Sequence, residues 1–405
     1  MFKGFLFSYS KKSIRANNMD INKLRSQIPA TQNVVYMNTG WSGPSPISVV
    51  DAIVKRLEIE SSLGPASPQV LASGRETRQD LREALASFLH VRPSELTLTQ
   101  NTTEGQNIVI NGLDWKPGDE VITFSLEHNS VLVPCYYLER RHGTVTKLLP
   151  LSPDEDQESI VTKVEAAITP RTRLIFMSHV QFKSGLRMPV EQLQNLARAK
   201  GVLTLIDGAQ GVGHIDLDLR ELGVDFYAMP GHKWMMGPDG VGSLYIREEL
   251  IPRVQPMKVS GHAVDSGHGY RNFAIKHEDI QKFELTTTND ALWAGYREAI
   301  RFREQLLVGE AEQHSLELAS QAKASLAAIP GVFITSPLEG PGCTGLVTFA
   351  VEGWEPADLV NALEAEKEIS IRAVSNPANV RMSLAFFNTE AEVDRVANAV
   401  RGMVK

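Results

Sequence analysis

The feature that most constrains the fold is an alternation of short apolar runs and helical segments across the middle of the chain. The runs begin at Val121, Leu174, Val202, Asp225 and Val241. They show little of the polar alternation of a strand with one face in water, which indicates buried strands. Amphipathic segments such as 190–201 separate some of them. This order is typical of β-α-β units, so we predict an α/β fold with a mostly parallel central sheet.

The length of 405 residues exceeds one ordinary core, and it predicts more than one domain. We expect an N-terminal arm over 19–45, rich in Gly and Pro near its end, and a large domain over 46–295. A helical pattern from Ala291 leads into a smaller α+β C-terminal domain over 296–405. Residues 1–18 carry basic and no acidic side chains. They form either a disordered or upstream tail, or a segment for organelle targeting.

The composition favours a small-molecule substrate over a polyanionic partner. The formal net charge is -7, which argues against nucleic acid or a membrane surface as the main partner. No apolar run reaches the length of a membrane span. Two cysteines are too few for a disulfide framework or a four-thiolate metal site, so we expect no metal and a reducing, cytoplasmic setting.

Polar side chains follow several of the predicted strands at the point where each strand ends. In open parallel sheets, ligands bind at these carboxyl ends. The residues in question are Glu127, His128, Asp207, His232 and Lys233, together with a helix that opens at Thr102 and Thr103. The free amides of that helix start suit a phosphate, although an isolated "NTTEG" is read more simply as a capping sequence.

Lys233 is harder to explain by structure alone, because it stands in the apolar stretch "YAMPGHKWMMGPDGVG". An amine among apolar neighbours loses its charge readily, and a neutral amine is the nucleophile that forms a Schiff base. A lysine of this kind, an acid that can protonate a pyridine nitrogen and a phosphate cradle together indicate pyridoxal 5′-phosphate as the cofactor.

The motifs "DGAQ" and "GHKWMMGPDGVGSLYI", with Asp207 and Lys233 26 positions apart, resemble those of the class V aminotransferase family. This group has the fold type I of pyridoxal phosphate enzymes, and it contains cysteine desulfurases, cystine C-S lyases and isopenicillin N epimerase. The resemblance covers nearly everything after Asn33. It implies a large domain with a mostly parallel sheet, a smaller α+β C-terminal domain and a homodimer with shared active sites.

The resemblance also implies roles at the cofactor ring. Lys233 forms the Schiff base and moves the proton at the substrate α-carbon. Asp207 pairs with the pyridinium nitrogen, Gln210 contacts the phenolic oxygen, and His128 stacks on the ring.

Other roles concern the phosphate and the substrate. Thr102, Thr103 and His232 hold the phosphate, and Thr287 in "FELTTTN" reaches the phosphate of the neighbouring subunit. Arg381 binds the substrate carboxylate with its planar guanidinium fork. Gly40 and Trp41, on the arm, are expected to reach the substrate.

Three departures from the family pattern bear on the reaction. The segment "EISIRAVSNPANVR" before Arg381 lacks the persulfide cysteine of the desulfurases, and we expect Cys135 and Cys343 to be buried structural thiols. Phe182 stands where desulfurases carry an asparagine, and Pro230 stands where a serine often helps to bind phosphate.

We therefore expect β-elimination from a cysteine-type, cystine-type or S-conjugated amino acid, as in the cystine-lyase branch that "GLDWKPGDEVITFSLEH" resembles. An aminotransferase and an epimerase of the same family are the alternatives. A cofactor-dead scaffold would require the loss of Lys233 or Asp207, and both are present. A dinucleotide-binding oxidoreductase fits poorly, because neither "GAQGVG" nor "GPDGVG" has the required glycine spacing at the start of a helix.

Overall fold

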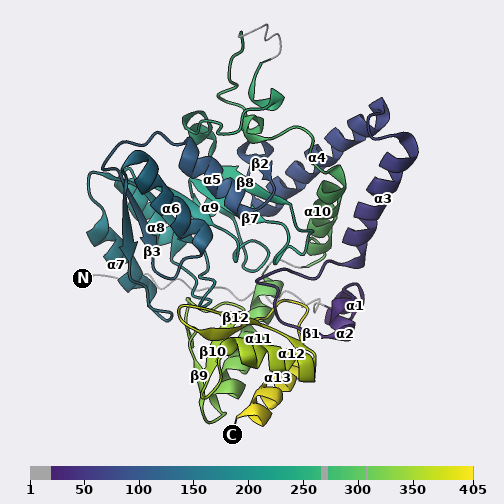
Figure 1. Ribbon diagram of the computed structural model, residues 1–405, viewed down its shortest axis with the longest axis vertical. Coiled ribbons are helices and arrows are strands. Elements are labelled where there is room, and N and C mark those ends of the chain that lie inside the picture. The colour runs from purple at the N-terminus through teal and green to yellow at the C-terminus, as the bar shows by residue number, and fades with distance from the viewer. Residues whose placement is uncertain (1–19, 266–271, 307–308, 405) are drawn as a thin grey trace, which may run out of the picture.

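The computed structural model describes residues 20–265, 272–306 and 309–404, and the predicted tail 1–18 lies outside them. The chain forms a broad body built around a large sheet and a smaller body that carries the C-terminus (Figure 1). None of the helices in these ranges is long and apolar enough to cross a membrane.

A seven-stranded sheet in the order β2-β8-β7-β6-β5-β3-β4 forms the centre of the broad body. Its strands are β2 (Leu96–Thr99), β3 (Glu120–Phe124), β4 (Val145–Leu149), β5 (Thr172–Ser178), β6 (Leu203–Asp207), β7 (Phe226–Pro230) and β8 (Gly242–Ile246). The strands from β3 to β7 are parallel, which confirms the predicted mostly parallel sheet. Only β8 runs antiparallel to both of its neighbours, because the loop from β7 returns directly to the sheet without a crossover helix.

Helices cover both faces of this sheet, as expected of an α/β fold. They are α3 (Ile47–Leu63), α4 (Pro68–Leu89), α5 (Thr102–Gly112), α6 (Asn129–His142), α7 (Gln157–Ala167), α8 (Val190–Ala199), α9 (Leu219–Leu222) and α10 (Asp290–Arg303). Side chains of α5 and α6 join one apolar core, and those of α4, α7, α8 and α10 join another. After α8 the chain turns at Gly201 with φ of 69°, a conformation that glycine adopts without strain.

The smaller body packs helices on a four-stranded sheet in the order β12-β13-β10-β9. Its elements are α11 (Glu310–Ala327), β9 (Val332–Ile334), β10 (Leu346–Val351), α12 (Pro356–Lys367), β11 (Ile369–Ser370), β12 (Arg372–Val374), β13 (Asn379–Ser383) and α13 (Glu390–Met403). Short 3-10 turns elsewhere span Pro93–Glu95, Glu248–Arg253, Gly261–Ala263 and Ile280–Phe283.

The N-terminal arm joins the smaller body rather than the large sheet. It contains α1 (Ile21–Ser26), α2 (Ala30–Asn33) and β1 (Val35–Tyr36). Strand β1 pairs in parallel with β11, whereas β12 pairs with β13. The segment 369–374 therefore splits at Ile371, because its two halves pair with different strands.

The division of the chain at residue 295 stays a proposal. Helix α10 is continuous through that position and packs against α3 and α4 of the broad body.

Candidate active site

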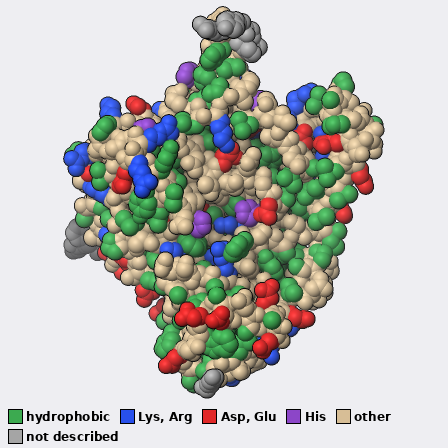
Figure 2. Space-filling view, viewed as in Figure 1, with side chains coloured by type: hydrophobic (Ala, Val, Ile, Leu, Met, Phe, Trp, Pro, Cys, Tyr) green, Lys and Arg blue, Asp and Glu red, His purple; other side chains and the backbone are tan. Residues whose placement is uncertain are grey.

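A cavity of about 170 Å³ lies at the carboxyl ends of β5, β6 and β7, beside strands of the smaller body. Most of the predicted site residues line it, namely Gly40, Thr102, Thr103, His128, Asp207, Gln210, His232, Lys233 and Arg381. Figure 2 shows histidine and basic side chains gathered near the centre of this face. The sheet thus brings together residues that are far apart in the sequence.

Two predicted residues lie outside the cavity lining. Trp41 is 52% exposed, and its ring lies 3.4 Å from the guanidinium carbon of Arg372, which does line the cavity. Thr287 is exposed and has φ of 60°, an unusual value for a β-branched residue. Trp41 therefore lies next to the cavity, where its ring packs against Arg372. Thr287 does not reach the cavity of its own chain.

Lys233 follows β7 in the loop that leads to β8. Burial lowers the pKa of its amine to about 8, and the nearby Asp207 carboxylate partly opposes this effect. The arm closes over this loop, since Gly43 N donates to the carbonyl oxygen of His232 at 2.7 Å. Lys233 is thus a lysine that loses its proton unusually easily and faces a buried acid.

Asp207 ends β6 and is buried. Its Oδ1 accepts a hydrogen bond from Ala209 N at 2.8 Å. Its negative charge also opposes the lowering of the pKa of His128 and Lys233. One carboxylate at the end of a central strand therefore influences both neighbouring bases.

Helix α5 directs its N-terminus at the cavity. Asn101 caps the helix by accepting a hydrogen bond from Glu104 N at 2.9 Å, and its carbonyl accepts from Gly105 N at 3.3 Å. In the described chain this leaves the amides of Thr102 and Thr103 without an acceptor. Free amides at the positive end of a helix suit a phosphate group.

His128 presents an uncharged ring to the cavity. Ser130 N donates to its Nδ1 at 3.1 Å, so the proton of the neutral imidazole lies on Nε2. Burial lowers the pKa of His128, which favours this neutral form. The ring of Phe182 meets it in an edge-to-face arrangement with centroids 4.9 Å apart.

Arg381 lies on β13 and is fully buried. Its Nη1 donates to the carbonyl oxygen of Phe182 at 3.0 Å, whereas its Nε and Nη2 have no partner among the described residues. Burial, with the positive charge of Arg372, lowers the pKa of Arg381 to about 9. A buried guanidinium with two free donors requires an anion, and a planar carboxylate matches its fork.

Arg372 is a site residue that the sequence reasoning missed. It lies opposite Arg381 in the register of β12 and β13 and lines the same cavity. The sequence shows two arginines flanking a turn, but the register that places them side by side is visible only in the structure.

The buried side chain of Glu127 lies behind the residues that line the cavity. It accepts hydrogen bonds from Ser178 N at 2.9 Å and Gln181 Nε2 at 2.6 Å, and also from Ser178 Oγ. Burial raises the pKa of its carboxyl to about 7 despite these donors. Because Ser178 lines the cavity, this carboxyl supports the wall next to His128.

Neither cysteine lines the cavity. Cys135 is buried, as expected, and burial raises the pKa of its thiol. The expectation that Cys343 is buried is wrong: it is half-buried, because it lies in the turn before β10, where its Sγ accepts from Lys323 Nζ at 3.2 Å.

The family model described as "Aminotransferase class-V" matches residues 35–396. The chain belongs to the class V aminotransferase family. This confirms the resemblance on which the sequence analysis relied, and with it the fold type I of pyridoxal phosphate enzymes.

Relatives within the class V family carry different names. The chain is 30% identical to a probable cysteine desulfurase of Mycolicibacterium paratuberculosis, over 94% of this chain and 58% of that protein. It is 32% identical to isopenicillin N epimerase of Amycolatopsis lactamdurans, over 94% and 98% of the two chains. A solved structure of the cystine C-S lyase C-DES with cysteine persulfide has a TM-score of 0.87 at 27% identity, covering 93% and 99% of the chains.

Class V aminotransferases use pyridoxal 5′-phosphate, which confirms the predicted cofactor, and the residues present fit this group. Besides the two free donors of Arg381, the Nδ1 of His232 is buried without a hydrogen-bond partner in the described chain. The lysine with a lowered pKa, the buried acid and the free amides of α5 lie around the same cavity. These groups match the aldehyde, the ring nitrogen and the phosphate of the cofactor.

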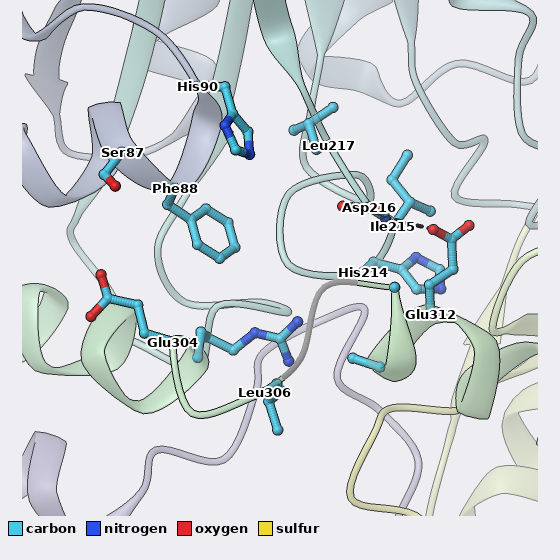
Figure 3. A pocket seen from close by; sticks show the side chains of 13 residues that line it. Ser87, Phe88, His90, His214, Ile215, Asp216, Leu217, Glu304, Leu306 and Glu312 are labelled. Carbon is cyan, nitrogen blue, oxygen red and sulfur yellow. Dashed lines mark hydrogen bonds between the residues drawn. The ribbon is translucent and has the colours of Figure 1, made fainter. Parts of the chain in front are cut away.

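A second cavity of about 270 Å³ is lined by residues 214–217, by the end of α4 and by the start of α11 (Figure 3). None of the predicted site residues of this class V protein lines it. His214 stands at its wall and also makes contact with Gln210 of the active site, with 2.9 Å between His214 Nδ1 and the Gln210 carbonyl oxygen. Within the described ranges, no cluster of three or more His, Cys, Asp or Glu residues is arranged to hold a metal.

Proposed function

We propose that this enzyme catalyses β-elimination at the C-S bond of a cysteine-type, cystine-type or S-conjugated amino acid. The observation that carries the proposal is the absence of a thiol from the described cavity lining and from the turn between β12 and β13. Without a cysteine in the site to take up the sulfur, cleavage of the C-S bond releases it as a sulfide, persulfide or thiol, while the carbon skeleton leaves as pyruvate and ammonia. The structural likeness to a cystine C-S lyase supports the same reaction.

Lys233 would act as the base in this reaction. When bound, the cofactor supplies an electron sink for the pair left at the substrate α-carbon. A lysine with a pKa of about 8 has a substantial neutral fraction near physiological pH, so it can accept the α-proton and then donate a proton to the departing sulfur. Asp207 would keep the ring nitrogen protonated.

Arg381 would orient the substrate. Its free Nε and Nη2 would bind the α-carboxylate, which neutralises the buried charge and fixes the α-carbon relative to Lys233. The amides of Thr102 and Thr103, with His232, would hold the phosphate. His128 would cover one face of the ring and help to exclude water.

We further propose that the active enzyme is a homodimer. Helix α3 exposes an apolar stripe at helical spacing, with Ile47, Val50, Val54 and Leu57 each 46–49% exposed. An apolar stripe of this kind is typical of an interaction surface. Thr287, which is exposed and does not line its own cavity, would contact the phosphate in the partner subunit's site.

The epimerase relative supports a second candidate, in which the α-carbon is reprotonated on its other face.

The test incubates the purified holoenzyme with cystine, cysteine and S-conjugated amino acids, without any keto acid. We expect pyruvate and ammonia to form, and Lys233→Ala to abolish both. Turnover only with an added keto acid would identify an aminotransferase, and inversion at the α-carbon without elimination would identify an epimerase; either result would refute the lyase proposal.

A further inference from the structure

Two hydrogen bonds hold the side-chain amide of Gln210: its oxygen accepts one, and its nitrogen donates the other. Trp234 Nε1 donates to Gln210 Oε1 at 2.8 Å, and Gln210 Nε2 donates to the carbonyl oxygen of Gly40 at 2.8 Å. An indole N–H can only donate and a carbonyl can only accept. Turning the amide over would place donor against donor and acceptor against acceptor, so only one orientation is allowed.

This orientation leaves one N–H of Gln210 free for a ligand. The amide nitrogen carries two hydrogens, and Gly40 takes one of them. No acceptor among the described residues takes the second, and Gln210 lines the cavity. The chain therefore offers a fixed donor to an oxygen atom of whatever occupies the site.

His214 contacts both the backbone of Gln210 and the indole ring of Trp234. Gly345 N donates to its Nε2 at 2.9 Å, so the proton of the neutral ring lies on Nδ1, which donates to the carbonyl oxygen of Gln210 at 2.9 Å. Burial lowers the pKa of His214 to about 3, which keeps the ring neutral. The ring stacks on the indole of Trp234, with centroids 3.7 Å apart and an interplanar angle of 3°.

The stacked rings of His214 and Trp234 are buried, and glycines lie against them. Gln210, His214 and Trp234 are all more than nine-tenths buried. A Cβ on Gly345 would lie 2.8 Å from His214 Nε2, and a Cβ on Gly213 would lie 2.9 Å from the carbonyl oxygen of Trp234. Only glycine lets the two rings and the smaller body come this close.

We propose that His214 and Trp234 are a pair of positioning residues that orient the Gln210 amide so that its free N–H donates to the cofactor's phenolic oxygen. Neither touches the cofactor; both act through Gln210. The proposal rests on the proposed role of Gln210 at the cofactor. It also links the smaller body to the site, because Gly345 precedes β10.

The expected effect is a change in the titration of the bound cofactor. A donor stabilises negative charge on the phenolic oxygen. That charge is greatest when the cofactor's titrating nitrogen has lost its proton, so the donor favours the deprotonated form. Loss of the donor should therefore raise the pH midpoint at which the cofactor's absorption band changes.

The experiment is a double-mutant cycle on the holoenzyme, read from the pH titration of the cofactor band. Trp234→Phe keeps an aromatic ring for stacking and removes the indole N–H, along with part of the bicyclic ring. We expect it to raise the midpoint by about one pH unit, the size of a hydrogen bond to a charged group. Gln210→Leu should raise it at least as much, and the double variant should match Gln210→Leu alone, because both act along one path.

Trp293→Phe is the matched control, since Trp293 is buried, lies outside the cavity and has an indole N–H without a partner in the described chain. It should leave the midpoint unchanged. Should Trp234→Phe not fold, His214→Phe replaces it in the cycle, because that ring can still stack.

An unchanged midpoint in Trp234→Phe, or shifts that add in the double variant, would overturn the proposal. A protein without any cofactor band would instead refute the proposed function.

Discussion

Arg381 and Lys233 show how burial prepares single residues for this chemistry. Water would screen and solvate either charge at the surface, but inside the cavity burial lowers the pKa of both groups. The lysine responds by releasing its proton easily, whereas the guanidinium stays charged and requires an anionic partner. Lys233 and Arg381, although they line the same cavity, thus have different tasks.

Arg381→Ala should raise KM for any α-amino acid substrate about 100-fold, because two hydrogen bonds to a charged group are lost. The measurement is steady-state kinetics of pyruvate release. Arg395→Ala, on the exposed side of α13, is the control and should change nothing. Unaltered kinetics in Arg381→Ala would remove this residue from the substrate site.

Lys233 should make cofactor binding to the apoenzyme depend on pH. Only the neutral amine attacks the aldehyde, and its pKa of about 8 is below the ordinary value for lysine. The rate at which the absorption band returns on adding pyridoxal phosphate should therefore rise with pH and level off above about 8. A rate that still rises beyond pH 10 would mean that the amine is not perturbed.

At the scale of elements, the arm and the loop after β7 close the site from one side. A Cβ on Gly43 would lie 2.2 Å from the carbonyl oxygen of Lys233, so the two backbones fit together only with glycine at this position. The fit of the arm is thus coupled to the placement of the lysine.

Gly43→Ala should lower the free energy of unfolding by about 3 kcal/mol through overpacking, and it should make the arm easier to cleave by protease. Chemical denaturation and limited proteolysis measure these effects. Gly261→Ala is the control, because a Cβ there meets no atom within 4 Å. Equal stability of the two variants would show that the arm does not pack as described.

The sequence predicts helices and strands well where the apolar pattern of a segment alone decides its structure. The amphipathic segment expected over 190–201 contains α8, and the strands expected from Val121 and Leu174 lie where they are predicted. The split of 369–374 and the antiparallel β8 were not predicted, since each depends on a distant partner strand. Arg372 was missed for the same reason, because strand register brings it to Arg381.

For the molecule as a whole, the proposed dimer predicts complementation between two inactive variants. Lys233→Ala removes the amine of its own site, and Thr287→Asp should repel the phosphate in the partner's site. Mixed subunits would contain one intact site in each heterodimer, so an equal mixture should recover roughly a quarter of normal activity. Analytical ultracentrifugation and the activity of the refolded mixture test this. A monomeric active enzyme, or a mixture without activity, would contradict shared sites.

The most direct test of the account asks which residue carries the cofactor. The holoenzyme is reduced with borohydride and digested, and the peptides are analysed by mass spectrometry. We predict that the added mass of the reduced cofactor lies on Lys233 and is lost in Lys233→Ala. Attachment at another lysine, or no covalent attachment in a protein that still turns over its substrate, would contradict the account.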